Sequence, residues 1–144
     1  METIRFNIGV EIGGTNIKVA LIDEQHNIDG IIDVVMNNKI PIKEFKTHVN
    51  PEDTIKEISK WILEENKINS TNINKVGISN FGPLNLQVGQ EDYGKILNTP
   101  KPGWKGFHVV ESFSRNLNIS KDQIIIELDV NCAAYLEYKL GNHG

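Results

Sequence analysis

"GVEIGGTNIKVALID", residues 9–23, joins two alternating runs of apolar residues through a Gly-Gly-Thr turn. Alternation with a period of two is typical of strands, so residues 4–12 and 16–23 predict an antiparallel pair. Glycine can adopt positive φ, which would aim successive backbone N–H groups of the turn at one point. The turn is therefore a candidate phosphate cradle, although Gly-Gly also forms ordinary hairpin turns; its residues are Gly13, Gly14 and Thr15.

The composition is that of an ordinary globular domain, with 144 residues of which 39% are hydrophobic and 24% charged. A net charge of -4 offers no electrostatic attraction for nucleic acid or for an anionic membrane. No apolar run is long enough to span a bilayer. The start of the chain has no signal-peptide pattern. A single cysteine, Cys132, and four scattered histidines offer neither a disulfide nor a zinc cluster. We expect a cytoplasmic protein that binds neither nucleic acid nor membranes.

Helices and strands follow one another along the rest of the chain. Residues 80–106 are rich in glycine and proline and are too long for an ordinary connection, which predicts a loop that is either functional or disordered. We predict one α/β domain with a mixed five-stranded sheet and the order β-β-β-α-β-α-β-α. The predicted strands are 4–12, 16–23, 28–36, 76–79 and 123–128, and the predicted helices are 50–66, 107–117 and 129–141.

A carboxylate, Asp129, stands where the last predicted strand gives way to a helix. If the first, fourth and fifth strands run parallel, Glu11, Ser79 and Asp129 end at one edge of the sheet, beside the glycine turn and the long loop. A carboxylate facing a phosphate cradle suits phosphoryl transfer to a hydroxyl: Asp129 would accept the proton, with Mg²⁺ near Glu11 and Lys18 near the phosphates. Each residue also has a plain interpretation: a helix cap for Asp129, and solvated side chains for Glu11 and Lys18.

Four segments together resemble the amino-terminal domain of the ROK family of sugar kinases, and its bacterial fructokinases in particular. The resemblance implies the actin-like ATPase fold (ribonuclease H-like) and transfer of phosphate from Mg-ATP to a sugar hydroxyl. It also implies a two-domain kinase, of which residues 1–144 form the sugar-binding and phosphate-turn domain. The segments are "GVEIGGTNIKVALID", "GISNFGPLNL", "LNTPKPGWKGFHVV" and "ELDVNCAAYLEYKLG".

Site roles are carried over from this resemblance position by position. Gly13, Gly14 and Thr15 would form the ATP-phosphate turn, Glu11 the metal-side carboxylate and Asp129 the general base. The loop that shapes the sugar pocket would include Gly82, Pro83, Asn98, Thr99 and Trp104. For Trp104, packing as a loop anchor is the alternative, and Asn131 would support either the sugar or the helix start.

The chain departs from the family's pattern at three positions. Glu11 stands where many members have aspartate, and Asn16 follows the turn where lysine is frequent, which leaves the positive charge to Lys18. Leu128 replaces an asparagine that hydrogen-bonds the sugar in glucose-type members, which favours fructose because leucine makes no such bond.

The resemblance places the adenosine pocket and a cysteine-histidine zinc site in a second domain outside these residues. Zinc is therefore expected only there, and the isolated chain is expected to be inactive. The complete protein is expected to be a homodimer that binds a sugar and ATP. Two other functions are open: a sugar-responsive regulator, which the short segment before the glycine turn disfavours, and a non-catalytic sugar-binding domain.

Overall fold

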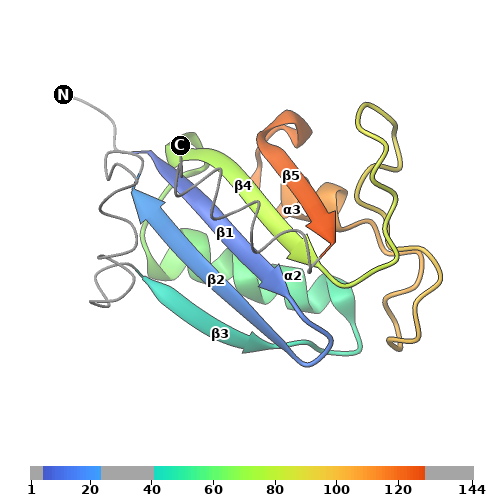
Figure 1. Ribbon diagram of the computed structural model, residues 1–144. Helices are drawn as coiled ribbons and strands as arrows, with labels where there is room; N and C mark the ends of the chain where they lie inside the picture. Colours follow the sequence, from blue (N-terminus) through green and yellow to red (C-terminus); the bar gives the residue numbers. More distant parts are fainter. Residues whose placement is uncertain (1–4, 24–40, 129–144) are drawn as a thin grey trace, which may run out of the picture.

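The computed structural model describes residues 5–23 and 41–128, which form one sheet with helices packed on it (Figure 1). The sheet has five strands in the order β3-β2-β1-β4-β5. β1, β2 and β3 are joined as antiparallel neighbours, whereas β1, β4 and β5 run parallel. This is the mixed five-stranded sheet that the sequence predicts. The strands are β1 (Phe6–Ile12), β2 (Asn16–Asp23), β3 (Ile42–Lys46), β4 (Ile73–Asn80) and β5 (Ile124–Leu128).

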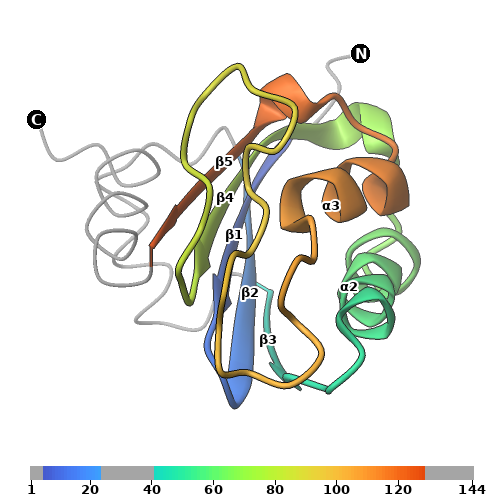
Figure 2. The same cartoon turned by 90° about the vertical axis from the view of Figure 1, so that its right-hand side faces the viewer.

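The core lies between the sheet and two helices, α2 (Pro51–Lys60) and α3 (Val109–Leu117), which cover the same face (Figure 2). Alternation along β1 buries every second side chain against them, and the registered residues of β4 and β5 do the same. The other face of β1 carries Asn7, Gly9 and Glu11. Residues buried from the strands include Ile8, Val10, Ile12, Val76, Ile78, Ile124 and Ile126.

Two of the three predicted helices, 50–66 and 107–117, are confirmed, with local capping that explains where they begin. The Asp53 N–H donates to Asn50 Oδ1 at 3.1 Å, Pro51 occupies the first turn, and the helix continues as a π-helical turn, Trp61–Glu65. α3 begins at His108, whose Nδ1 accepts from the Glu111 N–H. Single 3-10 turns, Ser70–Asn72 and Lys121–Gln123, precede β4 and β5.

One side chain, Glu52, joins the two helices. Its Oε1 accepts from Ser112 Oγ at 2.9 Å and from Arg115 Nη2 at 2.6 Å, and its Oε2 accepts from Asn116 Nδ2 at 3.0 Å. Burial alone would raise the pKa of this carboxyl, but the hydrogen bonds from Asn116, Arg115 and Ser112 outweigh it and hold the pKa below its ordinary value. The charged form of Glu52 therefore stabilises the packing of α2 on α3.

The third strand of the meander is Ile42–Lys46, which the sequence analysis did not identify. Only Phe45 of this edge strand is buried, and its lysines and glutamate give no apolar alternation to recognise. The strand predicted at 28–36 and the helix predicted at 129–141 lie outside the described residues. β4 is longer than the predicted 76–79, because Ile73 and Lys75 also pair with Phe6 and Asn7 of β1.

The free edge of β5 is covered at its middle by a side chain from the long loop. Tyr93 Oη accepts from the Ile126 N–H at 2.9 Å and donates to the Ile126 carbonyl at 3.3 Å. The Ile124 N–H donates to the Lys121 carbonyl. A phenol therefore takes the place of a neighbouring strand.

No helix within residues 5–23 and 41–128 is both long and apolar enough to cross a membrane.

Candidate functional site

The carboxyl ends of β1, β4 and β5 meet at one edge of the sheet, because Ile12, Asn80 and Leu128 are in register. One residue earlier, Glu11 pairs with Ser79, and Ser79 pairs with Glu127. Glu11 and Ser79 therefore lie at the edge that the sequence predicts for them, with the glycine turn directly after β1. Asp129 follows Leu128 in the sequence but, like Asn131, lies outside the described residues.

The glycine turn is closed by its own backbone, since the Gly13 N–H donates to the Asn16 carbonyl at 3.0 Å. The expectation that the turn glycines have positive φ is wrong. Among the described residues the glycines with positive φ are 89, 94, 103 and 106, which do not include Gly13 or Gly14. A Cβ on Gly13 would lie 3.0 Å from the Asn16 carbonyl oxygen, whereas a Cβ on Gly14 would meet no atom within 4 Å. Close packing explains the first glycine, but nothing in the described fold requires the second.

The backbone amides of the turn differ in what they can offer a ligand. The N–H of Gly13 is used inside the turn, so it is not available to a phosphate. Within the part of the chain that the structure describes, no hydrogen bond engages the N–H groups of Gly14 and Thr15, and both residues are exposed. Two adjacent exposed amides, with no side chain on the first residue, form a suitable anion cradle.

A threonine that the sequence analysis missed holds this turn. Thr47 follows β3 and is only 8% exposed. Its Oγ1 donates to the Gly13 carbonyl at 2.8 Å, and its N–H donates to the Thr15 carbonyl at 2.9 Å. No signal in the sequence pointed to Thr47, because the strand that delivers it was not recognised.

Charged side chains line the face of the sheet opposite the helices, next to the turn. Lys18 is the direct cross-strand partner of Glu11 and also pairs with Glu44 on β3, so it lies between two carboxylates. Glu11 and Lys18 are both exposed. An exposed carboxylate is a ligand that Mg²⁺ accepts, and a nucleotide-bound Mg²⁺ needs only one or two protein carboxylates. Residues 5–23 and 41–128 contain no group of three or more His, Cys, Asp or Glu side chains that could hold a metal ion.

Two buried side-chain atoms at the end of β4, Ser79 Oγ and Asn80 Oδ1, have no hydrogen-bond partner among residues 5–23 and 41–128. Such atoms cost about 1–3 kcal/mol each and are uncommon in native structures. Ser79 lies in the row between Glu11 and Glu127, and Asn80 lies beside Ile12. Two of the three buried side-chain atoms without a hydrogen-bond partner in the described residues thus lie at the edge where the predicted site residues gather, and the third, Ser59 Oγ, lies on α2.

The loop predicted to shape the sugar pocket starts against this same edge. The Phe81 N–H donates to the Ile12 carbonyl at 3.1 Å, so Gly82 and Pro83 begin beside the glycine turn. The Pro83 carbonyl accepts from the Leu97 N–H at 2.8 Å, which brings the segment containing Asn98 and Thr99 next to Pro83. These four predicted positions lie together, and each is at least partly accessible: Gly82, Pro83, Asn98 and Thr99.

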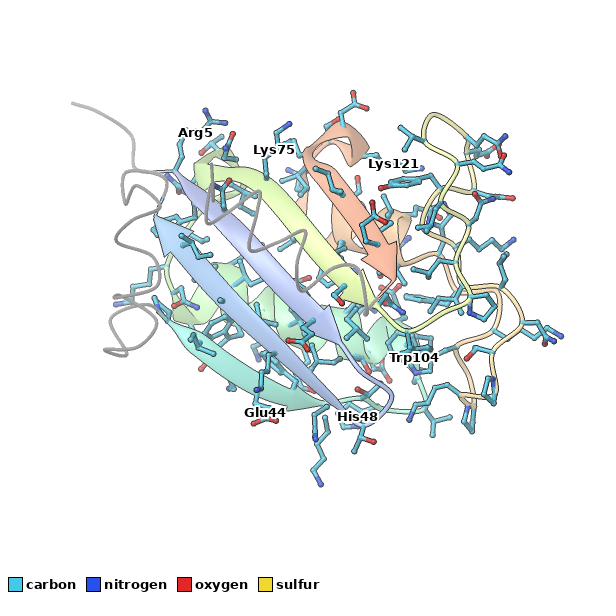
Figure 3. The ribbon with its side chains drawn as sticks, viewed as in Figure 1. Arg5, Glu44, His48, Lys75, Trp104 and Lys121 are labelled. Atoms are coloured by element: carbon cyan, nitrogen blue, oxygen red, sulfur yellow. The ribbon has the colours of Figure 1, made fainter. Side chains whose placement is uncertain are left out.

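Trp104 anchors the loop and has no exposed area. Its ring packs edge-on against Phe81 and Phe107, with centroids 5.5 and 5.6 Å apart, and its Nε1 donates to the His48 carbonyl at 2.7 Å (Figure 3). Gly103, at a φ of +85°, lies so close to Val49 that a Cβ would fall 1.9 Å from its carbonyl oxygen. In this conformation Trp104 acts on the site by holding the loop against the segment that also carries Thr47.

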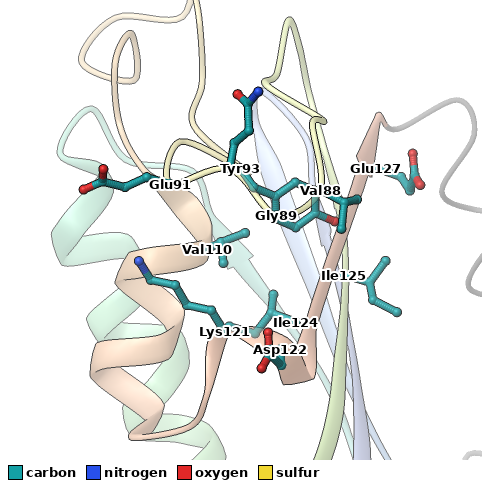
Figure 4. A pocket seen from close by; sticks show the side chains of 11 residues that line it. Val88, Gly89, Glu91, Tyr93, Val110, Lys121, Asp122, Ile124, Ile125 and Glu127 are labelled. Carbon is teal, nitrogen blue, oxygen red and sulfur yellow. The ribbon is translucent and has the colours of Figure 1, made fainter.

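A separate hollow of about 460 Å³ lies at the outer edge of β5 (Figure 4). It is bounded by the loop around Tyr93, the first turn of α3 and the strand itself. None of the predicted phosphate or sugar residues lines it, so it is not the site that the sequence predicts. Its lining residues are Val88, Gly89, Gln90, Glu91, Tyr93, Val110, Lys121, Asp122, Ile124, Ile125 and Glu127.

The strand order and the position of the turn define an actin-like ATPase fold. A ROK family glucokinase from Streptomyces griseus, solved in complex with glucose and AMPPNP, matches over 94% of this chain and 37% of its own, with a TM-score of 0.62 and 21% identity. At that identity the match shows the fold alone.

The chain belongs to the ROK family, whose family model matches residues 7–144. It is 34% identical over 131 residues to a fructokinase of Lactococcus lactis subsp. cremoris and 29% identical over 128 residues to a fructokinase of Zymomonas mobilis. These matches cover 90% and 89% of this chain. They cover only 38% of each relative, so the chain spans well under half their length.

Proposed function

We propose that this chain is the amino-terminal domain of a two-domain, ATP-dependent sugar kinase that transfers the γ-phosphate of ATP to a hydroxyl of fructose. The observation that carries the proposal is the shared edge of β1, β4 and β5, where the Gly14 and Thr15 amides, Glu11 and the start of the sugar loop come together. Membership of the ROK family and the similarity to two fructokinases support it.

The chain's own residues have three tasks in this reaction. The N–H groups of Gly14 and Thr15 bind phosphate oxygens, and Lys18 adds a positive charge beside them. Mg²⁺, bound near Glu11 with the nucleotide, would neutralise charge on the phosphates. Asp129, the residue after β5, accepts the proton of the attacking sugar hydroxyl as general base, and Asn131 supports the sugar or the helix start.

The sugar side is formed by the loop that Trp104 anchors. Gly82, Pro83, Asn98 and Thr99 shape the pocket wall, with the backbone held by the bond between Pro83 and Leu97. Fructose is the proposed sugar because Leu128 replaces the asparagine expected in glucose-type members and because both relatives named above are fructokinases.

The test is a kinase assay of the complete protein with ATP and a panel of hexoses. We expect fructose to give the highest kcat/KM, and Asp129→Asn to lower kcat by about 10² or more with little change in the affinity for the sugar. An Asp129→Asn variant with unchanged turnover would exclude Asp129 as the base. Preference for glucose would exclude the role given to Leu128.

We also propose that residues 1–144 alone are inactive, since phosphoryl transfer needs the nucleotide held from a second domain. The complete protein is proposed to be a cytoplasmic homodimer that binds neither nucleic acid nor membranes, with any zinc in its second domain. Calorimetry of the isolated chain with fructose and with ATP, and sedimentation of the complete protein, test these points. Turnover by residues 1–144 alone would contradict the first.

A further inference from the structure

We propose that Thr47 is a positioning residue for the phosphate turn, whose hydroxyl sets the direction of the Gly14 N–H. The inference rests on the proposed function and extends it to a residue outside the predicted site. Thr47 makes two hydrogen bonds to the turn, from Oγ1 to the Gly13 carbonyl at 2.8 Å and from its N–H to the Thr15 carbonyl at 2.9 Å.

Peptide planarity links the first of these bonds to the ligand side of the turn. The carbonyl of Gly13 and the N–H of Gly14 belong to one rigid trans peptide unit and point in opposite directions. When Thr47 Oγ1 holds the carbonyl, the Gly14 N–H must point away from Thr47. No other hydrogen bond to this peptide unit is found among the described residues. Without the hydroxyl, the unit is free to rotate and the amide loses its fixed direction.

The position of Thr47 is itself fixed by the segment 47–50. The His48 carbonyl accepts from Trp104 Nε1 at 2.7 Å, and the Val49 carbonyl packs on Gly103. Thr54 Oγ1 accepts from the His48 N–H at 3.3 Å and donates to the Asn50 carbonyl at 3.1 Å. The phosphate turn is thereby held from the same segment that anchors the sugar loop, and Thr47 is the residue of that segment that hydrogen-bonds to the turn in the described residues.

The experiment compares three variants of the complete protein. Thr47→Val keeps the shape of the side chain but removes the donor, and it is expected to raise the KM for ATP about 10-fold while the KM for the sugar changes less than about 2-fold. Thr47→Ser keeps the hydroxyl and is expected to stay within about 3-fold of wild type for ATP. Ser114→Ala is the control: it removes a hydroxyl that also donates to a backbone carbonyl, that of Ile119 at 2.6 Å, but lies on α3 and bonds neither the turn nor segment 47–50, so its KM for ATP should not change.

The readouts separate positioning from general stability. Thermal unfolding is measured for every variant, because a purely structural role would make Thr47→Val and Ser114→Ala lower the melting temperature and affect both KM values alike. An unchanged KM for ATP in folded Thr47→Val, or an equal rise in Ser114→Ala, would overturn the proposal. Thr47→Ala, which also lacks the hydroxyl, replaces Thr47→Val if the latter does not fold. Failure of both to fold would also overturn it, because positioning one peptide unit is not a requirement for folding.

Different results would refute the proposed function and the proposed role of Thr47. A wild-type protein with no sugar kinase activity refutes the proposed function, and the role of Thr47 falls with it. An active wild type whose Thr47 variants show no selective loss of ATP affinity refutes only the role of Thr47.

Discussion

Gly14→Ala tests whether the second glycine of the turn is required for stability or for binding of the nucleotide. Gly14 is exposed, is not among the described glycines with positive φ, and an added Cβ would have no atom within 4 Å. Alanine at a compatible position stabilises a protein by roughly 0.4–1 kcal/mol, chiefly by restricting the unfolded chain. We therefore expect the melting temperature of Gly14→Ala to stay constant or to rise by a few degrees.

Binding of the nucleotide should change in the opposite direction. A methyl group beside the Gly14 N–H obstructs a phosphate oxygen, and a hydrogen bond to a charged group contributes about 1.5–3 kcal/mol, so the KM for ATP should rise roughly 10- to 100-fold. Steady-state kinetics at saturating sugar measure this change, with thermal unfolding measured in parallel. Gly13→Ala is the matched control: its Cβ would lie 3.0 Å from the Asn16 carbonyl oxygen, so it should lose stability.

The pair of variants gives a clear refutation. If Gly14→Ala leaves the KM for ATP unchanged, the exposed amides of the turn do not bind phosphate. If Gly14→Ala is destabilised as much as Gly13→Ala, the second glycine is needed by the fold and carries no information about a ligand.

The remaining predictions concern how the helices and the loop are held. The pKa of Glu52 is lowered in the folded state, so its stabilising contribution is present above about pH 4.5 and is lost as the pH falls through the lower, folded-state pKa. Urea unfolding at several pH values should therefore show that Glu52→Gln loses less stability in acid than the wild type does. Trp104→Ala should cost about 3–5 kcal/mol by equilibrium unfolding, and a smaller loss would contradict its role as loop anchor. Gly103→Ala should destabilise the same loop, because its Cβ would overlap the Val49 carbonyl; an unchanged melting temperature would show that the contact can relax.

Apolar periodicity was sufficient to predict most of the sheet and both described helices. β1 and β2 bury alternate residues on one face, and β5 has three consecutive isoleucines, so these strands are evident from the sequence. Periodicity could not reveal β3, whose only buried residue is Phe45. An edge strand with one core contact is identified by its backbone pairing to β2, which a single sequence does not show.

Only those parts of the candidate site that belong to local sequence motifs could be predicted. The Gly-Gly-Thr turn and Glu11 were identifiable because they follow a clear strand, and parallel pairing brings them to the edge where β4 and β5 end. The role of Thr47 depends on contacts across more than thirty positions of the chain, from Thr47 to Gly13. The wrong expectation of positive φ has a similar origin: the turn closes through the Asn16 carbonyl, a contact that composition does not reveal.

The hydroxyl of Tyr93 bears on whether molecules of this protein can associate by pairing strands at β5. A strand added from a neighbouring molecule would need the N–H and carbonyl of Ile126, and both are already bonded to one phenol. Each half of the remaining edge is too short for an incoming β-strand to align stably. The Tyr93 hydroxyl therefore opposes strand addition at the middle of β5, and with it open-ended assembly through that strand.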